Sequence, residues 1–179
     1  MILNKIKSFF IPLFLLAFSL FGCGVKVQYS FSGAATNAKN ISITEFYNNA
    51  DLGPANMGQS FTNELKNYFL QNSSLSIVQE NGELQFEGEI TDFKINPLAP
   101  TVNPNQNQLS SASSTRLTIS VKVTFVNTLD EKMSFKNRNF SFYKDFPNEL
   151  TLSDVEEQFT KEIFERIITD IFNASIANW

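Results

Sequence analysis

The most regular segment of the chain, RLTISVKVTF (116–125), alternates apolar and polar residues without a break. Its apolar positions are Leu117, Ile119, Val121, Val123 and Phe125. Because successive side chains of a β-strand point to opposite faces of the sheet, this pattern predicts a strand with one buried and one polar face. A sheet with a polar face is typical of antiparallel pairing, since all-parallel sheets are covered on both faces. The segment therefore predicts a sheet whose core lies on one side only.

Four other segments predict the remaining strands: NISITEF (40–46), LSIV (75–78), LQFEGEI (84–90) and MSFKNRNFSFYKDF (133–146). The turn residues Asn81 and Gly82 separate LSIV from LQFEGEI, so we expect these two segments to form a hairpin. In the last segment the apolar positions change parity between Phe135 and Phe140. That change predicts a β-bulge, because one extra residue reverses the alternation.

Two segments have helical periodicity. Pro54 is well suited to the first position of a helix, and the apolar residues that follow recur every four positions until about Asn72. These residues are Met57, Phe61, Leu65 and Phe69. Near the end of the chain, Ser153 and Glu156 have the spacing of a capping box, which predicts the start of a second helix. Its apolar face comprises Val155, Phe159, Ile163, Phe164, Ile167, Ile168, Ile171 and Phe172.

The order of these elements is strand, helix, several strands and helix. It predicts an α+β two-layer sandwich, with two helices packed on one face of a four- to five-stranded, mostly antiparallel sheet. The segment 97–115 is rich in Pro, Asn, Gln and Ser and has no periodicity. A loop of this length is usually either functional or disordered, and the residues leave both alternatives open.

The composition excludes several classes of enzyme. The chain has no histidine, so it can form neither a Ser-His-Asp or Cys-His arrangement nor a histidine-based zinc site. It has no glycine-rich phosphate loop of a standard kind. A hydrolase that uses carboxylates alone remains an alternative, but Glu87 and Glu89 are spaced as on the solvated face of a strand. We therefore predict a protein that is not an enzyme and needs no cofactor or metal.

The first residues have the pattern of a secretory signal. Lys5 and Lys7 precede the uncharged run 9–21, which is too short to span a bilayer. A buried helix of a cytosolic domain is the alternative. Without Lys5 and Lys7 the chain is more acidic than its formal net charge of −4, so we expect no nucleic-acid partner.

The next residues, LFGC (20–23), resemble a lipobox, the signal by which bacterial lipoproteins are lipidated on cysteine and then cut just before it. Cys23 is the only cysteine of the chain, and a thiolate is the nucleophile that this lipidation needs. A free buried cysteine is the alternative, but it would not explain the position. We expect a signal peptide at 1–22, a lipidated tether at 23–36 and one α+β domain at 37–179; the short alternation within the tether leaves an edge strand there as an alternative. Acyl chains such as palmitate would hold the protein on a membrane.

Five segments carry a resemblance to a known family: YSFSG (29–33), SFTNELKNYFL (60–70), LQFEGEITDFKINPLAPT (84–101), RLTISVKVTF (116–125) and IFNASIANW (171–179). Together they resemble LptE, the lipoprotein of lipopolysaccharide assembly, in its compact form. The resemblance implies an outer-membrane lipoprotein that plugs the large β-barrel LptD, helps it to fold and binds lipopolysaccharide during insertion into the outer leaflet. The family fold, two helices against a small sheet, agrees with the elements predicted above.

The resemblance also implies candidate sites. Cys23 matches the lipidation site, and the basic residues that correspond to the lipopolysaccharide contact are Arg138, Lys136, Arg116 and Lys122. Arginine suits phosphate groups because of its bidentate fork. The alternative is that Arg116 and Lys122 pair across strands with Glu87 and Glu89.

The residues after the cysteine favour one location. Gly24 follows Cys23, with no aspartate in that place and no acidic cluster behind it. By analogy with other lipoproteins, this indicates the outer membrane, on the leaflet that faces the periplasm. A lipid-anchored accessory module of another envelope complex, for barrel assembly or as a secretion pilotin, remains the alternative function.

Overall fold

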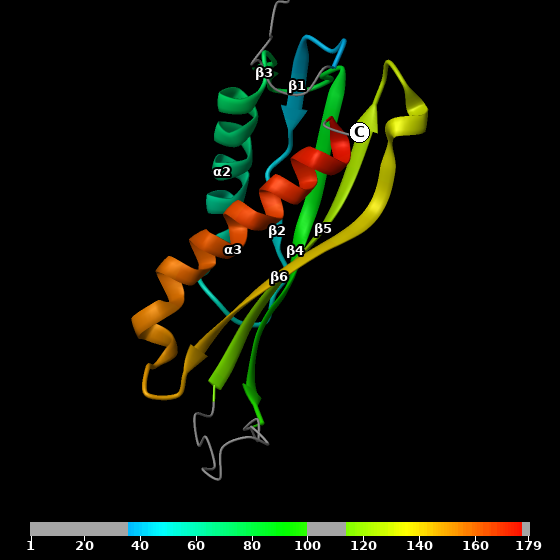
Figure 1. Ribbon diagram of the computed structural model, residues 1–179. Helices are drawn as coiled ribbons and strands as arrows, with labels where there is room; N and C mark the ends of the chain where they lie inside the picture. The colour runs from blue at the N-terminus through cyan, green and yellow to red at the C-terminus, as the bar shows by residue number, and fades with distance from the viewer. Residues whose placement is uncertain (1–35, 100–113, 177–179) are drawn as a thin grey trace, which may run out of the picture. The chain divides into compact units, whose positions relative to one another are not determined.

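The computed structural model describes residues 36–99 and 114–176 (Figure 1). The predicted signal peptide, the tether with Cys23 and its edge strand, and most of the segment 97–115 lie outside the described residues. The two ends of that segment belong to strands that are longer than the sequence predicts, since β4 extends to Leu98 and β5 begins at Ser114.

The strands form one mixed sheet, and their bounds are β1 Asn40–Ile43, β2 Tyr47–Asn48, β3 Ser76–Val78, β4 Leu84–Leu98, β5 Ser114–Asn127 and β6 Phe135–Pro147. The order across the sheet is β3-β1-β4-β5-β6, and β2 also pairs with β4 (Figure 1). The long strands β4, β5 and β6 are antiparallel, whereas β1 and β2 run parallel to β4 and β3 runs parallel to β1. The α+β class is confirmed, with a six-stranded mixed sheet in place of four to five mostly antiparallel strands.

The hairpin predicted between β3 and β4 is wrong, because β1 lies between these two strands and runs parallel to both. The connection 79–83 therefore has to pass over β1. Gly82 makes this passage: its backbone N–H donates to Ser42 Oγ at 3.1 Å. A Cβ at Gly82 would lie 2.4 Å from the backbone N of Ser42, so only glycine fits here. The same connection covers Ser42, which is therefore buried although its side chain is polar.

The alternation along β5 is confirmed, since all five predicted inward side chains have an exposed fraction of 0%. The bulge in β6 is confirmed too. Val123 pairs with Arg138, and Phe125 pairs with Phe135. Between these two pairs β6 advances by three residues and β5 by two, so β6 contains one extra residue. Asn137 within this bulge has a φ of 52°. Asparagine is one of the few residues that adopt this left-handed conformation readily. The residue at position 137 therefore suits the backbone conformation of the bulge.

The helices are α2 Met57–Asn72 and α3 Leu152–Ser175, and a short 3-10 helix, η1 Glu131–Met133, lies between β5 and β6. Helix α2 ends where predicted but begins three residues after Pro54, whose carbonyl instead accepts a hydrogen bond from Met57 N. The capping box of α3 is formed by Thr151 and Asp154 rather than by Ser153 and Glu156. The same spacing occurs two residues earlier in the chain, and the helix starts at the earlier pair.

Both helices lie on the same side of the sheet (Figure 1). The core between the two layers is rich in phenylalanine side chains. The ring of Phe61 on α2 meets Phe164 on α3 at a centroid distance of 5.0 Å. Phe86 and Phe125 stack on the sheet at 4.6 Å. Burial of these large aromatic side chains stabilises the layers without any disulfide. Neither described helix has the length and apolar character that a membrane crossing requires.

Candidate functional site

The predicted basic residues fall on two different surfaces. Residues directly opposite each other in an antiparallel pair share a face of the sheet. Arg116 lies opposite Asp145, and Lys122 lies opposite Glu89 and Asn139, in the set of positions that alternates with the buried residues of β5. These two side chains therefore belong to the open face of the sheet, opposite the helices.

Arg116 forms an ion pair with Asp145 on this open face. Its Nε and Nη2 donate to Asp145 Oδ1 and Oδ2 at 2.7 and 2.8 Å. Its guanidinium carbon lies 3.6 Å from the ring centroid of Tyr143. These hydrogen bonds hold the pKa of Asp145 below its ordinary value. The sequence predicted a cross-strand partner for Arg116, but the partner is Asp145 rather than Glu87 or Glu89.

Lys122 is also paired, and here the alternative interpretation is confirmed. Its Nζ lies 2.7 Å from Glu89 Oε1, and the side-chain amide of Asn49 donates to the other oxygen of the same carboxylate. The pKa of Glu89 is lowered by both hydrogen bonds, that from Lys122 first. The nearby pair Lys94–Asp92 extends this row of compensated charges. The open face therefore offers little free positive charge to an anionic ligand.

Arg138 lies on the helix side of β6, because its register partner Val123 is buried beneath the helices. Strict alternation would place Phe135 and Arg138 on opposite faces, and the bulge places them on the same one. The guanidinium carbon of Arg138 lies 5.5 Å from the ring centroid of Phe135 and 5.2 Å from that of Phe140. The bulge thus places this cation beside two neighbouring aromatic rings, within the distance of a cation–π contact.

Arg138 has no carboxylate partner among the residues that the structure describes. Within residues 36–99 and 114–176, neither Arg138 nor Lys136 forms an ion pair, in contrast to Arg116 and Lys122. Both side chains belong to exposed positions of β6. Arg138 borders a shallow hollow of about 500 Å³ that also includes Asn173, Ala174 and Asp170 of α3, and the carboxylate of Asp170 pairs with Arg166. The structure therefore separates the four predicted residues into a compensated pair and an uncompensated pair.

The sequence analysis missed the two aromatic neighbours of Arg138. Phe135 and Phe140 mark the parity change that predicted the bulge, so the signal for them was present in the sequence. An exposed arginine flanked by aromatic rings can bind an anionic group whose surroundings are apolar. No group of three or more carboxylate, cysteine or histidine side chains that could hold a metal ion occurs in the described part of the chain.

These features define a small α+β domain, with two helices on one face of a mixed sheet and paired charges on the open face. Arg138 and Lys136 on β6 form no ion pair with the described residues. The chain belongs to the LptE family of lipopolysaccharide-assembly proteins, whose family model matches residues 38–175. The resemblance noted in the sequence is thereby confirmed.

Solved structures from three bacteria are similar to the chain. The uncharacterised lipoprotein B from Nitrosomonas europaea has a TM-score of 0.56 at 13% identity, and the match covers 86% of this chain and 91% of that one. A hypothetical protein from Chlamydia trachomatis has a TM-score of 0.49 at 12% identity, over 79% and 100%. A minor lipoprotein from Acinetobacter baumannii has a TM-score of 0.45 at 14% identity, over 79% and 94%. The first of these supports the fold. No curated protein sequence matches the chain.

Proposed function

We propose that this protein is an outer-membrane lipoprotein of the lipopolysaccharide transport machinery. It acts as plug and folding partner of an LptD-type β-barrel, and it assists the insertion of lipopolysaccharide into the outer leaflet. Membership of the LptE family over residues 38–175 supports this role. The proposed activity is binding and assembly, without a catalytic step.

Membrane attachment is part of the proposal. The lipobox-like LFGC motif makes Cys23 the lipidated residue, with residues 1–22 as signal peptide, 23–36 as tether and 37–179 as the domain. Gly24 after the cysteine favours the periplasmic side of the outer membrane. Two or more acyl chains hold a protein stably on a membrane, whereas a single one does so only marginally.

Arg138 and Lys136 are the proposed contacts with lipopolysaccharide. The observation that carries this choice is the charge of Arg138, which forms no ion pair with the described residues and lies beside the rings of Phe135 and Phe140. A phosphate group would gain charge-assisted hydrogen bonds from Arg138, and acyl chains would find apolar rings beside it. Arg116 and Lys122 are secondary candidates, because a phosphate would have to compete with Asp145 and Glu89 for them.

The experiment is a lipopolysaccharide-binding titration of the full-length protein in detergent. The double variant Arg138→Ala/Lys136→Ala should bind about tenfold or more weakly, since a hydrogen bond to a charged group contributes about 1.5–3 kcal/mol. A matched control, Lys39→Ala/Lys66→Ala, removes the same charge elsewhere and should change the affinity less than about twofold. Equal affinities of the two double variants would contradict the assignment of Arg138 and Lys136.

A further inference from the structure

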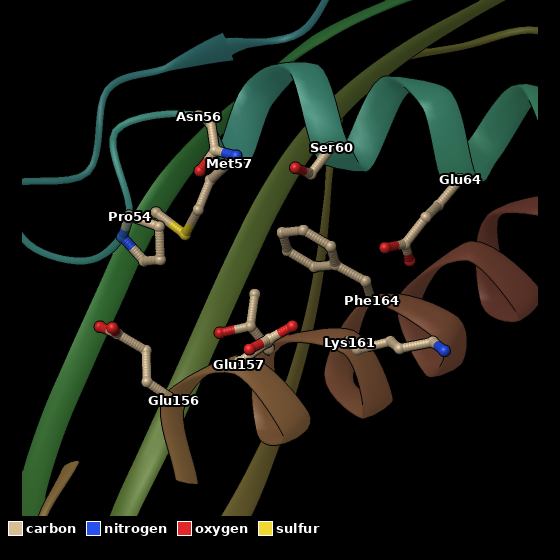
Figure 2. A pocket seen from close by; sticks show the side chains of 10 residues that line it. Pro54, Asn56, Met57, Ser60, Glu64, Glu156, Glu157, Lys161 and Phe164 are labelled. Atoms are coloured by element: carbon tan, nitrogen blue, oxygen red, sulfur yellow. The ribbon is translucent and has the colours of Figure 1, made fainter. Parts of the chain in front are cut away.

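A pocket of about 390 Å³ lies between the first half of α2 and the first half of α3 (Figure 2). Met57 and Glu64 line it from the α2 side, and Glu156, Glu157, Thr160 and Phe164 line it from α3. Glu156, Thr160 and Phe164 recur every four residues, so they share one face of α3. The pocket is therefore built by both helices, on a different part of α3 from the hollow beside Arg138.

Three carboxylates and one lysine, Lys161, line this pocket. Glu64, Glu156 and Glu157 form no ion pair with the residues that the structure describes. Burial raises the pKa of Glu64, Glu165 raises it further, and Lys161 partly offsets this effect. Figure 2 shows the amino end of Lys161 on the far side of Phe164 from Glu156. The lining of the pocket thus carries a net negative charge, which Lys161 offsets only in part.

A second observation comes from Thr160. This residue is only 8% exposed, and its hydroxyl is the one buried side-chain polar atom of the described residues that has no hydrogen-bond partner. An unpartnered buried hydroxyl costs free energy, so native proteins rarely contain one without a reason. Thr160 lies one helical turn from both Glu156 and Phe164, on the face that lines the pocket. A ligand that donates a hydrogen bond would satisfy this hydroxyl.

We propose that this pocket receives a basic side chain, arginine or lysine, from a partner protein. Charge complementarity carries the choice, because three carboxylates that form no ion pair with the described residues line the pocket together with the apolar side chains of Met57 and Phe164. Arginine and lysine side chains combine an apolar stem with a cationic head that donates hydrogen bonds. The stem would suit Met57 and Phe164, and the head would suit the carboxylates. A bound metal ion fits poorly, because the described residues hold no cluster of three metal-ligating side chains. The proposal does not rest on the lipopolysaccharide contact at Arg138.

The test is an NMR titration of the full-length, isotope-labelled protein in detergent micelles with N-acetyl-arginine methylamide. N-acetyl-citrulline methylamide is the control probe, since it has nearly the same shape but no charge. We expect saturable shifts of the backbone amides of Ser60, Glu64, Glu157 and Thr160 with the arginine probe only. No saturable shift, or an equal response to citrulline, would overturn the proposal. If putrescine binds and the arginine probe does not, the result would overturn the proposal in favour of a free diamine.

Variants that remove charge from the pocket test whether the arginine probe binds there. Glu64→Gln/Glu157→Gln should weaken binding of the arginine probe about three- to thirtyfold, as expected for the loss of two partly exposed ion pairs. Glu87→Gln is the matched control, because Glu87 belongs to the open face of the sheet and forms no ion pair with any described residue. It should bind as the unaltered protein does. Unchanged affinity of the double variant would also contradict the proposal.

Discussion

Arg116 and Asp145 form a bidentate pair across β5 and β6, with two hydrogen bonds of 2.7 and 2.8 Å. Both side chains lie on the open face of the sheet, where the strand register places them directly opposite each other. The pair satisfies the charge of Arg116 within the protein. This relationship separates Arg116 from Arg138, although the sequence offered both as contacts for an anionic ligand.

The first prediction concerns the pH dependence of this pair. Arg116→Met should return the pKa of Asp145 toward its ordinary value of 3.8, because the hydrogen bonds from Arg116 are the main cause of its lowering. The pKa is lower in the folded than in the unfolded chain. The stabilisation is therefore present above the ordinary value and is lost as the pH falls through the lowered one. NMR titration of the Asp145 carboxyl measures the shift, and an unchanged pKa in the variant would contradict this cause.

The second prediction concerns two buried threonines on different helices. Thr160→Val should raise the free energy of unfolding by about 1 kcal/mol, because its hydroxyl is desolvated without a partner. Thr62→Val should lower it by about 1–3 kcal/mol. Thr62 Oγ1 accepts from Phe46 N at 2.9 Å and donates to the Gly58 carbonyl at 2.7 Å. Urea denaturation of both variants checks the opposite signs, and two changes of the same sign would refute the account of these hydroxyls.

The third prediction concerns the bulge of β6. Asn137 has a φ of 52°, which a β-branched residue adopts only with strain. Asn137→Val should therefore lower the free energy of unfolding by about 1–2 kcal/mol, whereas Asn137→Gly should cost little. Thermal or urea denaturation separates the two variants. If valine were tolerated as well as glycine, the left-handed conformation would not be needed at this position.

The features that the sequence predicted correctly depend on local patterns. The alternation from Leu117 to Phe125 needs no knowledge of the partner strand, since burial on one face alone imposes it. The bulge near Asn137 was likewise visible as a parity change between Phe135 and Phe140. The two helices followed from their apolar periodicity, and only the start of each was displaced by a few residues. Helix starts are ambiguous when two capping pairs lie close together in the chain.

The features that it missed depend on contacts between distant segments. Asn81 and Gly82 are turn residues, but nothing local indicates that β1 lies between the strands they connect. The register of β5 against β6 decides that Arg116 meets Asp145, and a single chain does not reveal this register. The acidic pocket forms only when α2 and α3 pack together, so Glu64 and Glu157 gave no signal as a pair. The pairing of Lys122 with Glu89 was among the predicted alternatives, but the pairing of Arg116 with Asp145 was not.

The most direct test of the proposed role is purification of the tagged, full-length lipoprotein from outer membranes in mild detergent, followed by mass spectrometry. The account predicts a large β-barrel protein of the LptD type at a one-to-one ratio with this chain. A protein that is lipidated on Cys23 and located in the outer membrane, but purifies without such a barrel, would contradict the account. That result would instead favour an accessory module of another envelope complex.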